Sequence, residues 1–510
     1  MLTAFSVALG FGRESYIAYA YGATGYTDAF YVAAIVPDMV AGWISYSLTN
    51  ALIPVLKEEL HVSPISAKRL VGAVFWNTSL ALAVMTALGL LTKGVLVSLL
   101  APRFSLVEHA EAVRLLRIMM VAVLFSGLSG VLWGIHNAHE NFYYPSMVGI
   151  IYNILLLTVA LLLHPWVGIE ALAYGFLAGT IGRFLVQFIP LVAHNRLGAP
   201  DGLWHPALRS MMRSMGPIFA SVGVGSLNLI VDRILASGLN IGHLSDMNYA
   251  SKIGMLPNGL IGVAIATVLY TRFVTHTLEE DETQLRRITS EGFGWLIFVG
   301  LIVMSGFVIY APDLVAALYH RGAFTAADVR ITQSPLLIYG WFGVFYLASP
   351  LVTHFFFARK ENAFVMRSSL LAVAVNIVGS LSLVGPLGIV GLVLANALSQ
   401  AVYVLLQTRI MLRRLHWSAR VFLIEVFRRG LAPGLAFAVG AALAALTAPE
   451  HGYAMSSLAG LLRGLYGGTL GTATLLLYVS IARGNMVSRF LRDLFCGVVH
   501  RMVRAYRKRT

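Results

Sequence analysis

The chain has 510 residues, of which 58% are hydrophobic and only 12% are charged, and its formal net charge is +14. A soluble globular domain carries about twice this share of charged residues, so the composition excludes an ordinary soluble protein. A single cysteine, Cys496, excludes an intramolecular disulfide, and no Cys/His pattern in the sequence indicates a bound metal or redox chemistry.

Apolar runs of roughly 20 residues recur along the sequence, and each is long enough to cross about 30 Å of hydrocarbon as a helix. We therefore predict an all-α polytopic membrane protein with about fourteen transmembrane helices. The first six are expected at 1–22, 29–56, 70–91, 112–135, 145–163 and 169–193. The next six begin near residues 215, 249, 292, 336, 364 and 388, and the last two span 431–446 and 458–481.

The basic residues are concentrated in alternate connections. If the amino terminus is cytoplasmic, the cytoplasmic connections and the tail hold about 26 of the 37 lysines and arginines, which obeys the positive-inside rule. This predicts that both termini are cytoplasmic, and it explains the net charge without a nucleic-acid partner. The tail, 483–510, alternates basic and apolar residues, and we expect it to lie as an amphipathic helix on anionic membrane lipids.

The two halves of the sequence share residues at a constant offset of 220. Pairs at this offset are Pro37 and Pro257, Gly42 and Gly262, Arg13 and Arg233, Gly168 and Gly388, and Gln187 and Gln407. We infer a duplication of a six-helix unit, and an even number of spans gives both copies the same orientation. The predicted domains are an N-lobe at 1–198, a C-lobe at 199–416, helices 13 and 14 at 417–482, and the tail. Two parallel lobes favour a transporter that works by alternating access, although duplication alone does not exclude a channel.

Arg13 and Glu14 lie inside the first apolar span. Charges at this depth are costly unless they face a partner or a water-filled cavity, so the pair predicts a wet interior. The planar guanidinium of Arg13 suits phosphate oxygens, and Glu14 is placed to hold Arg13 in position before substrate arrives. The alternative is an ion pair that only packs helices together.

Three segments carry a resemblance to a known family: GRESYIAYAYGATGYTDAFYVA, VDRILASGLNIGHLSDMNYASKIGMLPNGLIGVAIATVLY, and LYHRGAFTAADV followed by HFFFARKENAF. Together they resemble the MurJ/MviN family of lipid II flippases, within the multidrug/oligosaccharidyl-lipid/polysaccharide exporter superfamily. The resemblance implies export of an undecaprenyl-pyrophosphate-linked precursor across the bacterial inner membrane for peptidoglycan synthesis. It also implies a cationic cavity within the first twelve helices, and a groove for the lipid tail at helices 13 and 14.

The candidate substrate-binding residues are Arg13, Glu14, Asp28, Lys252 and Arg233. Lys252 stands where the family usually has an arginine, and it would add a point charge from the second lobe. The alternative role of Asp28 is to cap helix 2. The alternative role of Arg233 is structural, because Arg233 and its neighbour Asp232 point in different directions on a helix and each needs its own partner. Arg183 is isolated in helix 6, where snorkelling at a lobe surface is expected.

The sequence departs from the family at three charged positions, where it has Val7, Ala41 and Tyr46. With fewer cations for a pyrophosphate, the alternative cargo is another polyprenyl-linked oligosaccharide, of the exopolysaccharide or O-antigen type.

Four residues of the second lobe carry the hard oxygen ligands that a sodium ion prefers, and we expect a tentative sodium site there. They are Asp232, Asn376, Ser380 and Asn396. The alternative is a neutral hydrogen-bond network between helices 7, 11 and 12. Transport driven by the membrane potential is a further alternative. No cofactor other than the sodium ion is expected.

Other functional classes fit less well. An enzyme such as a polyprenyl-sugar transferase would need an acidic cluster, which LEEDE at 278–282 does not provide. A cation-coupled drug exporter of the same superfamily would lack helices 13 and 14, and a scaffold would not need buried charges. We expect a monomer that is not an enzyme.

Overall fold

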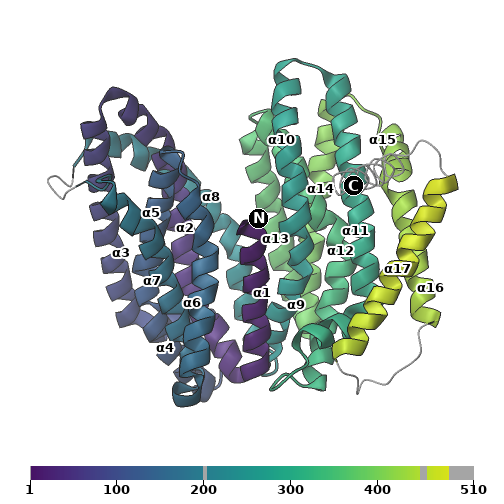
Figure 1. Cartoon of the computed structure of the whole chain (residues 1–510), viewed down its shortest axis with the longest axis horizontal. Coiled ribbons are helices and arrows are strands. Elements are labelled where there is room, and N and C mark those ends of the chain that lie inside the picture. The colour runs from purple at the N-terminus through teal and green to yellow at the C-terminus, as the bar shows by residue number, and fades with distance from the viewer. Residues whose placement is uncertain (1, 199–203, 448–456, 482–510) are drawn as a thin grey trace, which may run out of the picture. The chain divides into compact units, whose positions relative to one another are not determined.

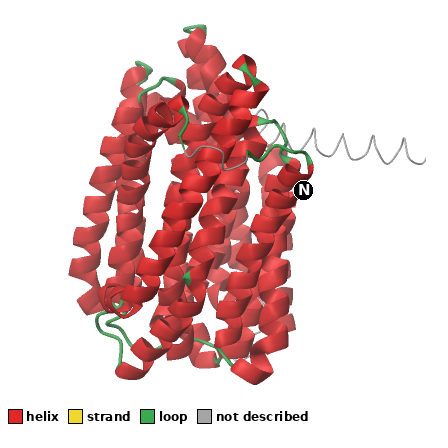
Figure 2. Cartoon of the chain, turned by 90° about the vertical axis from the view of Figure 1, so that its left-hand side faces the viewer, coloured by secondary structure: helices red, strands yellow, loops and turns green. Residues whose placement is uncertain are grey.

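The computed structural model describes residues 2–198, 204–447 and 457–481, and every element in these ranges is a helix (Figures 1 and 2). The elements in the first half are α1 (Leu2–Tyr21), α2 (Gly25–Val62), α3 (Pro64–Leu100), α4 (Leu106–Met119), α5 (Val121–Ala138), α6 (Tyr143–Val167), α7 (Glu170–Ala193) and α8 (Pro206–Ala236). Those in the second half are α9 (His243–Pro257), η1 (Asn258–Gly262), α10 (Val263–Leu278), α11 (Glu282–Tyr319), α12 (Ala326–Ala358), α13 (Asn362–Leu387), α14 (Ile389–Arg414), α15 (Ala419–Val426), η2 (Phe427–Leu431), α16 (Ala432–Thr447) and α17 (Ser457–Ile481), where η marks a π-helical turn.

The predicted all-helical membrane architecture is confirmed. Within the described residues, eleven helical segments are long and apolar enough to cross a membrane. The helices α1, α8 and α17 have 20, 31 and 25 residues but fall outside this group of eleven. The count of fourteen spans therefore stays a prediction, and the predicted basic tail lies outside the described residues.

Helix starts follow local sequence signals. Thr24 forms a capping box with Thr27 at the start of α2, and Ser63 caps α3 with Pro64 in its first turn. Ser105 and Glu108 form a second capping box at α4. The expected single helix at 112–135 is instead two helices, α4 and α5, which break at Met120.

The backbone repeats at the offset seen in the sequence. Residues with positive φ recur 220 residues apart, namely Gly22 with Gly242, Glu140 with Lys360, and Gly168 with Gly388. Each pair lies between equivalent helices, so the two halves place their left-handed turns at equivalent points of the chain. This agreement in backbone conformation supports a duplication of one six-span unit.

Two compact units emerge from the contacts within the chain. Unit 1 comprises 1–248, 321–328 and 380–392, and unit 2 comprises 249–320, 329–379 and 393–510. These units differ from the lobes at 1–198 and 199–416 and from the segments at 417–482 and 483–510, which stay predictions from the repeat.

Within unit 1, α2 packs against α3, α4, α5 and α8, while α6 packs against α1 and α7. The turn between α1 and α2 is tight. Gly22 has φ +66°, and a Cβ there would lie 2.6 Å from the carbonyl oxygen of Ala323. Gly242 has φ +87°, and a Cβ there would lie 2.4 Å from the carbonyl oxygen of Ala23. Only glycine fits these two positions without strain.

Within unit 2, α11 packs against α16, α17 and η2, and α16 packs along α17. Its core is aromatic and aliphatic: Phe273, Phe355 and Phe356 are fully buried, together with Leu296 and Leu351. In a membrane, side chains of this kind stabilise the unit by close van der Waals packing between helices, because lipid tails are as apolar as the side chains themselves.

Candidate functional site

Arg13 and Glu14 form an ion pair inside unit 1. The Arg13 Nη2 and Glu14 Oε1 atoms lie 2.5 Å apart, and the Glu14 side chain is only 3% exposed whereas that of Arg13 is 16% exposed. Tyr31 on α2 donates its hydroxyl to Glu14 Oε2 at 2.9 Å, and Arg13 Nη1 donates to Asn153 Oδ1 on α6 at 3.2 Å. Glu14 and Asn153 therefore fix the direction of the guanidinium, as expected for Glu14 from the sequence.

Tyr152 lies between two arginines. The Cζ atom of Arg13 is 5.7 Å from the centroid of the Tyr152 ring, and the Cζ atom of Arg183 is 5.6 Å from the same centroid. These distances allow cation–π attraction to the ring. In addition, Arg183 on α7 donates a hydrogen bond to the Ser126 hydroxyl on α5.

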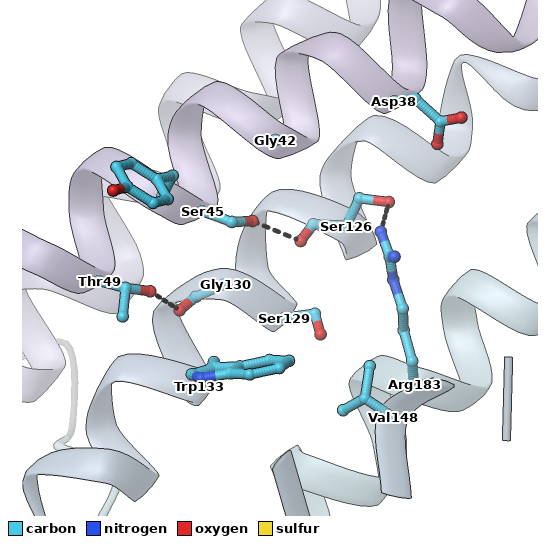
Figure 3. Close-up of a pocket in the computed structure, with 11 residues that line it drawn as sticks. Asp38, Gly42, Ser45, Thr49, Ser126, Ser129, Gly130, Trp133, Val148 and Arg183 are labelled. Carbon is cyan, nitrogen blue, oxygen red and sulfur yellow. Dashed lines mark hydrogen bonds between the residues drawn. The ribbon is translucent and has the colours of Figure 1, made fainter. Parts of the chain in front are cut away.

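The expectation that Arg183 snorkels at a lobe surface is wrong. Arg183 lines an internal pocket of about 500 Å³ in unit 1, because α7 directs this position toward α2 and α5 (Figure 3). The pocket is lined by Asp38, Gly42, Ser45, Tyr46 and Thr49 from α2, Ser126, Ser129, Gly130 and Trp133 from α5, Val148 from α6, and Arg183. A regular helical spacing places the α2 residues on one face of that helix.

Asp28 holds the start of another helix. Its carboxylate accepts hydrogen bonds from the backbone N–H groups of Gly242 and Ser245, both at 2.7 Å, and from the Ser245 hydroxyl. Gly242 directly precedes α9 and Ser245 lies in its first turn, so Asp28 caps α9. The cap of α2 is Thr24. The expectation that Asp28 caps its own helix is therefore wrong, although its role as a helix-capping residue stands.

Asp232 and Arg233 have separate partners, as their adjacency on a helix predicts. Asp232 Oδ1 accepts a hydrogen bond from the Ser380 hydroxyl at 3.0 Å, and Arg233 donates to Asn248 Oδ1 at 3.3 Å. The side chain of Arg233 is buried, and α13 brings Ser380 to Asp232.

The other candidates are distributed over unit 2. Asn376 is buried one turn before the Ser380 position on α13, and Asn396 on α14 accepts a hydrogen bond from the Tyr346 hydroxyl at 2.7 Å. Lys252 on α9 has an exposed side chain. In the described part of the chain, no group of three or more His, Cys, Asp or Glu residues is placed to hold a metal ion.

Sequence reasoning missed Tyr31, Tyr152 and Trp133. The first two join the Arg13 cluster, and Trp133 lines the pocket. The repeat marked only the neighbour of Tyr152, because Asn153 has a counterpart in the second half of the chain at Asn376. Tyr31 and Trp133 carried no signal, since aromatic residues are common in membrane spans.

A family model described as lipid II flippase MurJ matches residues 17–462, which is most of the chain. The chain belongs to the MurJ family of lipid II flippases. It is 28% identical over 373 residues to the lipid II flippase MurJ of Burkholderia cenocepacia, covering 70% of this chain and 72% of the relative. It is 26% identical over 414 residues to the probable lipid II flippase MurJ of Vibrio cholerae, covering 78% of each protein.

Solved structures show that the family fold extends over nearly the whole chain. A lipid II flippase MurJ in an inward closed conformation matches with a TM-score of 0.81 at 21% identity, covering 97% of this chain and 98% of the other. A multidrug-resistance transporter of the MATE family in an inward-facing conformation matches with a TM-score of 0.66 at 14% identity, covering 82% and 96%. The protein therefore has the fold of this transporter superfamily.

Proposed function

We propose that the chain flips lipid II, an undecaprenyl-pyrophosphate-linked cell-wall precursor, across the bacterial inner membrane by alternating access. The observation that carries this proposal is the match of the lipid II flippase family model to residues 17–462. The oriented guanidinium of Arg13, on a side chain that is 16% exposed, supports it, because a charge-assisted bond to phosphate is strong in a low-dielectric interior. Family membership gives a transporter, and we propose no catalytic reaction.

The superfamily also contains drug exporters, and the coverage of the structural matches separates the two readings. The MATE structure covers 82% of this chain, whereas the MurJ structure covers 97%. The helices α15 to α17 follow the two predicted six-helix lobes in the chain, and we take them as support for a lipid-linked cargo with an apolar tail.

A second candidate cargo is another polyprenyl-linked oligosaccharide. Tyr46, at one of the positions where the family usually has a charge, lines the pocket of unit 1 as an aromatic residue. Val7 on α1 and Ala41 on α2 also replace charges. Both cargoes are polyprenyl-linked, so the two would differ in the sugars that this pocket meets.

The setting of the protein is part of the proposal. We place both termini in the cytoplasm, because the basic residues gather in alternate connections. The protein would act as a monomer in contact with anionic lipids, with Lys252 and Arg233 as further cationic residues along the path of the cargo. Asp232 and Ser380, which are hydrogen-bonded to each other in unit 1, would supply oxygens to a sodium ion.

The test uses cells whose own lipid II export can be switched off. The unmodified chain is expected to restore growth, and Arg13→Ala combined with Glu14→Gln is expected not to. The second change avoids stranding a buried carboxylate. Loss of a charge-assisted contact costs about 1.5–3 kcal/mol, which is roughly a tenfold to hundredfold loss of affinity.

The matched control is Lys57→Ala with Glu140→Gln, which removes an exposed ion pair of the same unit. It should restore growth, as should Lys252→Arg. Rescue by the Arg13 double variant at equal membrane abundance would reduce Arg13 to a structural role. Accumulation of a different polyprenyl-linked glycan in the arrested cells, relieved by the chain, would establish the second cargo.

A further inference from the structure

The pocket of unit 1 has the composition of a site for a neutral, polyhydroxylated ligand. Its volume of about 500 Å³ lies within the range of small-molecule sites. Among its lining residues, one acid and one base carry charge, Asp38 and Arg183, so the lining has no net charge. A phosphate would be repelled by Asp38 and a metal cation by Arg183, whereas a neutral hydroxyl group can donate to the former and accept from the latter.

Hydroxyl groups and an aromatic surface complete the lining. In Figure 3, Trp133 lies at one end and the side chains of Arg183 and Asp38 lie at the other. The serines lie between them: Ser45, Ser126 and Ser129. The Trp133 side chain is 41% exposed, so its ring is open to a ligand, and a sugar ring presents apolar C–H groups that pack on an aromatic face.

Arg183 brings a guanidinium to the lining of this space. One of its nitrogens is bonded to Ser126, but Nε is buried and makes no hydrogen bond within the described part of the chain. A planar guanidinium has five N–H donors, so one bond to Ser126 does not use its full capacity to bind ligand oxygens. Gly42 leaves further room, because a Cβ at this position would meet no atom within 4 Å.

We propose that this pocket is a glycan subsite that binds a neutral sugar residue of the lipid-linked cargo. The inference rests on the proposed function for the identity of the cargo, but the pocket chemistry stands on its own. Arg13 and Arg183 contact the same Tyr152 ring, and each Cζ is within 5.7 Å of the ring centroid. Their separation is therefore at most twice that distance, so a phosphate at Arg13 and its attached sugar at Arg183 can be held together.

The position of Tyr46 supports this assignment. Its phenol ring is 59% exposed and lines the pocket. An aromatic side chain with a hydroxyl group suits a saccharide, since it offers an apolar face and a hydrogen-bonding tip. Tyr46 therefore adds a second aromatic residue to the lining beside Trp133.

The test measures binding of a soluble saccharide to the purified full-length protein in nanodiscs. The probe is N,N′-diacetylchitobiose, a neutral disaccharide. It is titrated against the protein, and its binding is followed by saturation-transfer NMR. We expect saturable binding that weakens about tenfold in Trp133→Ala and in Asp38→Asn, while Trp133→Phe keeps most of the affinity. The matched control is Trp76→Ala, which removes a tryptophan of similar exposure, 38%, that does not line the pocket.

Competition distinguishes the class of ligand. We expect inorganic pyrophosphate not to displace the disaccharide, because the lining has no net charge. Displacement by pyrophosphate, absence of saturable binding, or equal affinity in Trp133→Ala and the unmodified protein would each overturn the glycan subsite.

A transport arm separates this inference from the proposed function. The same proteins are reconstituted with a polyprenyl pyrophosphate that either carries a neutral disaccharide or carries no sugar. Disaccharide binding without transport of either lipid would overturn the proposed function and support the subsite. Equal transport of both lipids without disaccharide binding would support export of polyprenyl pyrophosphates and overturn the subsite.

Discussion

At the scale of single residues, the charges buried in unit 1 are oriented by specific partners. Glu14 is held by Arg13 and Tyr31, and Arg13 is held by Glu14 and Asn153. A buried ion pair gains stability only when such additional hydrogen bonds satisfy its remaining donors and acceptors. The Arg13 side chain is nevertheless 16% exposed, so this guanidinium is not sealed off by its partners.

The sequence located this pair but not its surroundings. The cost of a charge inside an apolar span is a local argument, and it correctly marked Arg13 and Glu14. The direction of an isolated charge depends on which helices pack around it, and this depends on tertiary contacts. For that reason the sequence predicts Arg183 at a lobe surface, whereas in the structure α7 directs its side chain toward Ser126 and the pocket.

The proposed sodium site gives a prediction at this scale. Asp232 accepts a hydrogen bond from Ser380, and a bound cation would stabilise the protein by its affinity for the folded state. We expect a higher melting temperature for purified protein in sodium chloride than in choline chloride at equal ionic strength. At sodium 100-fold above its Kd, the gain in unfolding free energy is about 2.7 kcal/mol.

Asp232→Asn should remove this difference while leaving a folded protein, because the amide oxygen still accepts from Ser380. Equal melting temperatures of the unmodified protein in the two salts would reject the sodium site and leave the hydrogen-bond network as the role of these residues.

At the scale of elements, helix positions follow from apolar length, and helix ends follow from capping. The expected 169–193 helix corresponds to α7 at Glu170–Ala193, and the expected 458–481 helix corresponds to α17 at Ser457–Ile481. The division between α4 and α5 at Met120 was not predictable, since neither proline nor glycine marks it. The same holds for the π-helical turns, which depend on packing against neighbouring helices.

The cap of α9 gives a prediction for an element. Asp28 accepts two backbone hydrogen bonds and one hydroxyl hydrogen bond at the start of this helix, and a charged cap also interacts favourably with the helix dipole. Asp28→Asn keeps one acceptor and loses the charge, so we expect a loss of about 1–2 kcal/mol of local stability. Amide hydrogen exchange at residues 242–246 should accelerate.

The control is Thr24→Ala, which removes the cap of α2 and should accelerate exchange at residues 25–28 without affecting 242–246. Unchanged exchange at 242–246 in Asp28→Asn would show that the carboxylate does not stabilise α9.

At the scale of the whole molecule, the duplication accounts for the fold. The offset of 220 in the sequence reappears as paired left-handed turns, of which Gly22 and Gly242 are the clearest. The sequence therefore predicted the helical class and the repeat. It did not predict the compact units, because segments 321–328 and 380–392 join unit 1 from distant parts of the chain. Such long-range contacts are not encoded in local periodicity.

The family assignment also operates at this scale. The match covers residues 17–462, and the resemblance found in the sequence is confirmed. Lipid II export by this chain, the cargo contact of Arg13 and the glycan subsite form one account, in which unit 1 binds the pyrophosphate and its attached sugar. Each part can fail separately, and export is the central claim.

The most direct test of that claim is transbilayer movement of fluorescent lipid II in proteoliposomes that contain only the purified chain. The fraction of label accessible to a membrane-impermeant quencher is followed after lipid II is incorporated. The account predicts that the accessible fraction rises above the one-leaflet level with the unmodified protein and with the Lys57→Ala, Glu140→Gln control, but not with Arg13→Ala, Glu14→Gln. An accessible fraction that stays at the one-leaflet level with the unmodified, folded protein would contradict it.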